Sequence, residues 1–129
     1  IQELGTVAQY NLPVRIMIMN NHWQGMVRQW QESFYDNRYS HSNMAQGQPD
    51  FVALANSYGI KGINIKNEEQ LHNALYEYRH YPHPILFDIL IIDEVGSGNF
   101  SDLTKLLLYS SVVVGILSGY SILVILQFN

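Results

Sequence analysis

The sequence predicts an α/β fold, a partial doubly wound parallel sheet, followed by a single transmembrane helix. Short apolar runs without strict alternation are typical of parallel strands that are covered on both faces. Stretches with apolar residues at helical spacing separate these runs, and this order is typical of doubly wound folds. Near the end of the chain, an uncharged run from Leu106 to Leu126 has the length of a membrane-spanning helix.

The first part of the chain predicts a helix, a strand and a second helix. The first helix ends at Pro13 and carries apolar residues at helical spacing: Leu4, Val7, Ala8 and Leu12. The apolar run Val14–Met19 predicts a buried strand. The second helix has a further set on one face: Met26, Val27, Trp30 and Phe34. The polar stretch 35–48 that follows predicts a loop.

A short helix, a strand and a third long helix are expected next. Asp50 follows Pro49 and opens the short helix, and Gly59 stands where a left-handed cap is expected. A short strand covers residues 60–65. Asn67 is a suitable N-cap of the following helix, with Gln70 three residues later as in a capping box.

The last predicted strand covers residues 85–92. Pro82 and Pro84 break the preceding helix, and the strand is nearly continuously apolar apart from Asp88. The resulting order α-β-α-α-β-α-β is a doubly wound pattern, and the sequence shows no internal repeat.

Composition excludes several classes of function. The 129 residues carry a net charge of −4, and the 7 Lys and Arg are scattered, so nothing indicates a nucleic-acid-binding stripe. The chain has no cysteine, which excludes disulfides and thiolate chemistry. None of the 5 histidines has the spacing of a zinc site. Ile1 is not an initiator residue, which indicates a truncated or processed start.

Charge divides the chain into an α/β domain, 1–95, a linker, 96–102, and a predicted transmembrane helix, 103–129. Lys105 and Tyr109 lie where interfacial anchors are expected, and a buried helix of a soluble protein is the alternative. Small residues spaced by four would form a face for close packing against a membrane partner: Ser111, Gly115 and Gly119. The charge pattern places the domain of this single-pass protein on the cytoplasmic or plastid stromal side.

The candidate site follows the first predicted strand. Asn20 and Asn21 lie at the carboxyl end of that strand, where open α/β sheets bind ligands. An Asn side chain offers a neutral oxygen that suits magnesium, and the Gln24-Gly25 pair lets the backbone pass close to a ligand. The alternative is a simple strand-to-helix turn, in which the Asn side chains bond to their own backbone.

Three runs, NNHWQGMVRQWQESFY, RYSHSNM and PDFVALANSYGIKG, closely resemble the catalytic large subunit of acetolactate synthase, of a cyanobacterial or plastid type. The resemblance extends from Ile1 to about Glu94. It implies the C-terminal domain of this enzyme family, which binds thiamine diphosphate, and the asparagine pair would close a motif that begins with Gly-Asp-Gly. That opening is absent from this sequence, and the sequence after Glu94 departs from the family.

The resemblance also implies roles for individual residues. Asn21 would give a side-chain ligand to Mg²⁺, and Trp23 a backbone carbonyl. The residues implied in cofactor binding are Asn21, Trp23, Gln24, Gly25 and Met26. Those implied in the substrate channel are Met26, Val27 and Trp30. No catalytic residue is assigned within the chain, because the family's activating glutamate comes from an N-terminal domain.

Two functions are expected. By resemblance, the chain is the C-terminal part of an enzyme that decarboxylates pyruvate and joins the product to a second 2-oxo acid, in branched-chain amino-acid biosynthesis. Such an enzyme is a homodimer or needs its remaining domains, which also hold FAD, so the isolated chain is expected to be inactive. The alternative is a non-catalytic, membrane-anchored subunit of a larger complex, which could be photosynthetic.

Overall fold

The computed structural model describes residues 1–90, 113–117 and 122–126. Its elements in chain order are α1 (Gln2–Gln9), β1 (Arg15–Asn20), α2 (Gly25–Phe34), α3 (Phe51–Ser57), β2 (Lys61–Ile65), α4 (Glu68–Glu77), β3 (Ile85–Leu90), β4 (Val113–Leu117) and β5 (Ile122–Leu126). Up to β3, this is the order that the sequence predicts.

The strands form a 5-stranded sheet in the order β2-β3-β1-β5-β4. β3 lies between β1 and β2 and is parallel to both. In this register Ile18 is paired with Asp88, and Asn20 with Leu90. The parallel sheet predicted from the sequence is therefore confirmed for β1, β2 and β3.

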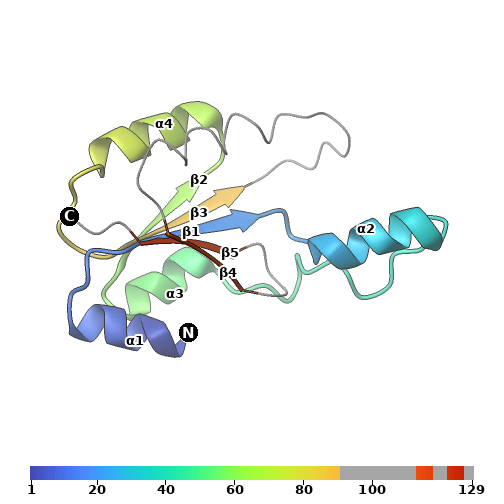
Figure 1. The fold of residues 1–129 in the computed structure, drawn as a ribbon, viewed down its shortest axis with the longest axis horizontal. Coiled ribbons are helices and arrows are strands. Elements are labelled where there is room, and N and C mark those ends of the chain that lie inside the picture. The colour runs from blue at the N-terminus through green and yellow to red at the C-terminus, as the bar shows by residue number, and fades with distance from the viewer. Residues whose placement is uncertain (91–112, 118–121, 127–129) are drawn as a thin grey trace.

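Helices cover both faces of the sheet, with α4 on one side and α1 and α3 on the other (Figure 1). The core on the α4 side consists of Met17, Met19, Ile65, Leu71, Ala74, Ile85, Phe87 and Ile89. The core on the α3 side consists of Val14, Ile16, Ile18, Phe51, Ala55, Ile60 and Leu86. The strands contribute to both cores, which is why their sequences are continuously apolar instead of alternating.

Helices α3 and α4 begin at the capping residues that the sequence predicts, and α3 is followed by the predicted left-handed glycine. The Asp50 carboxylate accepts a hydrogen bond from the Ala53 amide at 2.8 Å and caps α3. Asn67 caps α4 by accepting from the Gln70 amide at 2.9 Å. After α3, Gly59 has φ +72°, a left-handed conformation that glycine adopts without the steric cost of a Cβ atom.

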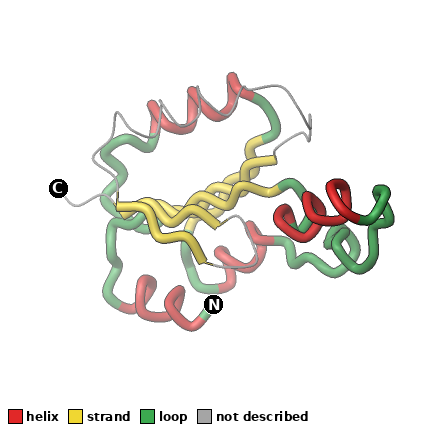
Figure 2. The backbone as a smooth tube through the Cα atoms, turned by 45° about the vertical axis from the view of Figure 1, so that its right-hand side comes forward, coloured by secondary structure: helices red, strands yellow, loops and turns green. Residues whose placement is uncertain are grey.

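None of the residues of helix α2 is buried, which is also true of α1, whereas α3 and α4 each bury two residues. Helix α2 projects beyond the carboxyl end of β1 instead of lying on a face of the sheet (Figures 1 and 2). Helix α2 therefore lies next to the edge of the sheet at which the candidate site was predicted.

The predicted helix from Leu106 to Leu126 is wrong at the residues that the structure describes. Residues 113–117 and 122–126 are β4 and β5, which pair with each other in antiparallel orientation, and β5 pairs with β1. Both segments are rich in β-branched Val and Ile, and an apolar run of this kind does not distinguish helix from strand by its periodicity.

The predicted membrane-packing face does not form a helical stripe at Gly115, which lies in β4 opposite Val124. Ser111 and Gly119, like the predicted linker 96–102, lie outside the described residues. Within the described ranges, the structure contains no helix with the length and apolar character needed to cross a membrane.

Candidate functional site

The candidate site begins at Asn20, the last residue of β1. This side chain is only 7% exposed. Its Nδ2 atom donates to the Asp88 Oδ1 atom at 3.0 Å, and its Oδ1 atom accepts from the His22 amide at 3.0 Å. Asn20 thus points back into the fold, and both ends of its amide group are bonded.

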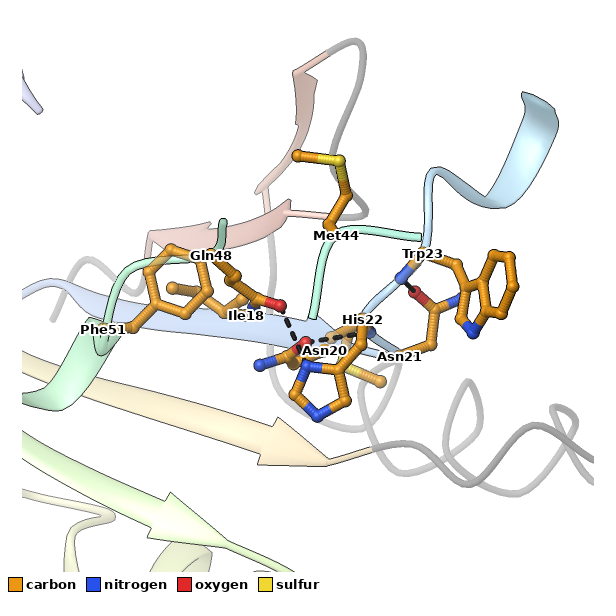
Figure 3. Close-up of a pocket in the computed structure, with 9 residues that line it drawn as sticks. Ile18, Asn20, Asn21, His22, Trp23, Met44, Gln48 and Phe51 are labelled. Atoms are coloured by element: carbon orange, nitrogen blue, oxygen red, sulfur yellow. Dashed lines mark hydrogen bonds between the residues drawn. The ribbon is translucent and has the colours of Figure 1, made fainter. Parts of the chain in front are cut away.

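Asn21 lies on the opposite side of the chain (Figure 3). Its side chain is half-buried, and its Oδ1 atom accepts from the Trp23 amide at 2.9 Å. The local turn that the sequence left as an alternative is therefore present. An amide oxygen has two lone pairs, so this bond leaves the second lone pair for a cation. The donor chemistry of Asn21 fits Mg²⁺.

The chain turns sharply between the two asparagines and α2. His22 has φ +61°, in the left-handed region that is uncommon for a residue with a side chain. Gly25 begins α2, and a Cβ atom there would lie 3.9 Å from the Asn21 Nδ2 atom, which is ordinary contact. In this structure, Gly25 is therefore not required by crowding from the described residues.

A second loop holds the turn from outside. The Gln24 amide donates to the Ser42 carbonyl at 2.9 Å, and the Met44 amide donates to the His22 carbonyl at 2.8 Å. The His22 ring Nδ1 atom is 2.9 Å from the Gln48 Oε1 atom. Ser42, which is 1% exposed, donates from its Oγ atom to the Gln31 Oε1 atom on α2 at 2.6 Å. The sequence predicted this stretch as a loop but not its bonds to the site.

Between these segments lies a cavity of ≈ 10 Å³. It is lined by Ile18, Met19, Asn20, Asn21, His22, Trp23, Met44, Gln48 and Phe51. A volume of this size holds about one water molecule. The residues around this cavity therefore do not enclose a molecule as large as a cofactor.

A cluster of polar and aromatic side chains from α2 and the following loop supports Trp23. The Arg28 guanidinium lies 4.4 Å from the centre of the Trp23 ring, and its Nε atom donates to Glu32 Oε1 at 2.8 Å. Tyr39 packs edge-on against Trp23 and donates to the same carboxylate at 2.9 Å. These bonds from Tyr39 and Arg28 lower the pKa of Glu32. The spacing of Arg28 and Glu32 by four residues is the only sequence signal for this cluster.

Comparison with known proteins decides the family. The model of the family "Thiamine pyrophosphate enzyme, C-terminal TPP binding domain" matches residues 1–89. The chain belongs to this family. Thiamine pyrophosphate is another name for thiamine diphosphate, so the match confirms the resemblance that the sequence motifs carry.

Individual relatives agree with the family. The chain is 57% identical over 91 residues to the acetolactate synthase large subunit of Cyanidium caldarium, covering 70% of this chain and 16% of the relative. It is 58% identical over 89 residues to that of Parasynechococcus marenigrum, covering 69% of this chain and 14% of the relative. The chain thus spans about a sixth of the length of these curated relatives.

A solved structure shares the fold of this thiamine pyrophosphate enzyme domain. The thiamine diphosphate-dependent 4-hydroxybenzoylformate decarboxylase of Rhodococcus jostii RHA1 matches with a TM-score of 0.61 and 28% identity. The match covers 70% of this chain and 17% of the decarboxylase.

Within this family domain, the predicted substrate-channel residues lie together on α2 and are exposed. Met26 is 77% exposed, Val27 42% and Trp30 58%. Trp30 also stacks on Phe34, with 4.8 Å between the ring centres. The structure brings these residues beside the asparagine turn, but the part of the chain that it describes forms no channel around them.

The charged residue nearest to the asparagine turn on the sheet is Asp88, which the sequence analysis did not assign to the site. Burial raises the pKa of Asp88 above its ordinary value, and the hydrogen bond from Asn20 opposes this shift. His22 lowers the pKa and Asp50 raises it through their charges. Its only signal in the sequence is a carboxylate inside an otherwise apolar strand.

Proposed function

We propose that this chain is the part of an acetolactate synthase large subunit that holds the diphosphate end of thiamine diphosphate through Mg²⁺. The similarity of about 70% of the chain to two such subunits, at 57% and 58% identity, carries this proposal. When bound, the cofactor would supply the carbanion chemistry for decarboxylating pyruvate and joining the product to a second 2-oxo acid.

The residues of this chain would bind and orient the diphosphate. Asn21 would offer its Oδ1 atom and Trp23 its backbone carbonyl to Mg²⁺, and Gln24 and Gly25 would let the backbone pass the diphosphate closely. The amino end of α2 starts at Gly25, so its free amides and positive dipole end favour an anion there.

Helix α2 would form one wall of the substrate channel. Its exposed apolar residues, Met26, Val27 and Trp30, need a cover that excludes water, and the described residues leave them open. We propose that other domains or a second subunit supply this cover, together with the FAD site and the glutamate that activates the cofactor.

The test uses a chimera of a full-length algal acetolactate synthase large subunit whose matching segment is replaced by residues 1–90 of this chain. Asn21→Ala is expected to raise the Mg²⁺ concentration for half-maximal activity by about tenfold, equivalent to about 1.4 kcal/mol. Asn43→Ala is the matched control, because Asn43 Oδ1 accepts from the amide two residues later, at Ala45, as Asn21 Oδ1 does from Trp23. Equal Mg²⁺ dependence in the parent chimera and in Asn21→Ala would refute the proposal.

A further inference from the structure

Two consecutive hydrogen bonds connect β3 to the turn that carries the proposed metal ligands. The Asp88 Oδ1 atom accepts from Asn20 Nδ2 at 3.0 Å, and Asn20 Oδ1 accepts from the His22 amide at 3.0 Å. Asn21, which lies between Asn20 and His22, accepts a hydrogen bond from the Trp23 backbone amide through its own Oδ1 atom. The connection thus ends between the two residues proposed to bind Mg²⁺.

The carboxylate of Asp88 determines which way the Asn20 amide faces. An ionised carboxylate only accepts hydrogen bonds, so it selects the Nδ2 side of the amide and leaves the Oδ1 side for His22. Asn20 is 7% exposed, so water does not readily replace either partner. A flipped amide would place a donor against the His22 amide and an acceptor against the carboxylate, and both bonds would be lost.

The backbone of the turn needs this bond. A φ of +61° at His22 is in the left-handed region, which is sterically unfavourable for a residue with a side chain. The Asn20 Oδ1 bond to the His22 amide holds the chain in this conformation, and the chain leaves the strand direction here. The orientation of Asn21 and Trp23 follows from the turn.

We propose that Asp88 is a positioning residue of the metal site, which fixes the turn carrying Asn21 and Trp23 through Asn20 and His22. Its role as positioning for a metal rests on the proposed function. The two-bond connection itself does not, because it joins only residues of this chain. The two parts are therefore tested by separate measurements.

The first measurement is amide hydrogen exchange by NMR on the 129-residue chain. Asp88→Ala removes the acceptor and is expected to speed exchange at the His22 amide by about five- to tenfold, since a hydrogen bond of this kind contributes about 1 kcal/mol. Asp88→Asn keeps an acceptor oxygen and should leave exchange within about twofold. Asn64→Ala is the control, because Asn64 is exposed and paired with Asp88 in the sheet register. Unchanged His22 exchange in Asp88→Ala would overturn the proposal.

Swapping the side chains of residues 20 and 88 distinguishes loss of the Asn20–Asp88 hydrogen bond from general damage to the fold. Asn20→Asp alone places two carboxylates within about 3 Å and should disrupt the turn. Combining it with Asp88→Asn restores one donor and one acceptor, because the new carboxylate still accepts from the His22 amide. The double variant should recover the slow His22 exchange. Failure of this rescue, with the chain folded, would also overturn the proposal.

The second measurement uses the chimeric enzyme. Asp88→Ala should raise the Mg²⁺ concentration for half-maximal activity by about fivefold, while the rate at saturating Mg²⁺ changes less than that. An effect no larger than that of Asn64→Ala, although His22 exchange is faster, would refute positioning of the metal site. If the parent chimera needs no Mg²⁺, the proposed function fails and the exchange experiment still decides whether Asp88 holds the turn.

Discussion

Asn20 and Asn21 have the same side chain but opposite surroundings. Successive residues of a strand point to opposite sides, so only Asn20 reaches the interior and Asp88. Asn21 keeps a half-exposed amide whose oxygen is used once, by Trp23. The identity of a residue thus does not assign its role here, and its burial and partners do.

The raised pKa of Asp88 predicts a pH dependence of stability. The folded chain holds this proton to a higher pH than the unfolded chain, in which the pKa is about 3.9. The stabilising contribution is therefore fully present below the unfolded pKa and is lost as the pH rises through the folded pKa. Asp88→Asn lacks this titration, so the free energy of unfolding of the original chain should fall relative to that of the variant as pH rises from about 3 to about 7.

Urea unfolding of both chains across this pH range would measure the difference. His22 and Asp50, which act on Asp88 through their charges, are present in both chains, so the comparison isolates the change at residue 88. A difference that is independent of pH, or that increases in favour of the original chain, would contradict the prediction.

At the scale of elements, the contact between β2 and α3 is closer than a side chain allows. A Cβ atom on Gly62 would lie 2.9 Å from the Val52 Cα atom and 3.0 Å from its carbonyl oxygen. Both are backbone atoms, so they cannot move aside as the end of a side chain can. Gly62 therefore lets α3 pack directly on the edge strand.

Gly62→Ala should lower the free energy of unfolding by about 1–3 kcal/mol, the usual cost of overpacking. Gly47→Ala is the matched control, because a Cβ atom at Gly47 meets nothing within 4 Å. Urea unfolding of both variants provides the comparison. Equal stability of the two variants would show that the β2–α3 contact relaxes without cost.

Helix α2 shows what an apolar pattern can predict about an element. The spacing of Met26, Trp30 and Phe34 predicts a helix and a shared face, and the helix is present. The same pattern in α3 and α4 accompanies burial, whereas these three residues are more than half exposed. Periodicity therefore identifies the face but not the surface that covers it.

For the whole molecule, the sequence predicts the helices and strands up to β3 and the parallel sheet. The continuously apolar β1 and β3, the caps at Asp50 and Asn67 and the left-handed Gly59 all act over short distances along the chain, so local patterns are sufficient. The contact between Asn20 and Asp88 joins residues 68 positions apart, and no local pattern indicates it. The tail misleads for a physical reason, because an uncharged apolar run suits two paired strands as well as one helix.

The 129-residue chain by itself should not make acetolactate. Its sequence contains no Gly-Asp-Gly, so it supplies Asn21 without the acidic ligand of the family motif, and the cavity of ≈ 10 Å³ beside Asn21 has no room for a cofactor. Incubation with pyruvate, thiamine diphosphate, Mg²⁺ and FAD should give no more acetolactate than a boiled sample. Product formation above that level would show that these residues suffice for catalysis.

The bond between Asn20 and Asp88 also has a consequence for the order of events during synthesis. The asparagine turn emerges from the ribosome well before Asp88 does, and β3 must insert beside β1 before the carboxylate reaches Asn20. A nascent chain that ends before residue 88 would therefore contain both proposed metal ligands without the bond that arranges them. Cofactor capture would wait for the completed sheet, and a ligand that binds only the folded domain would stabilise that domain against reopening.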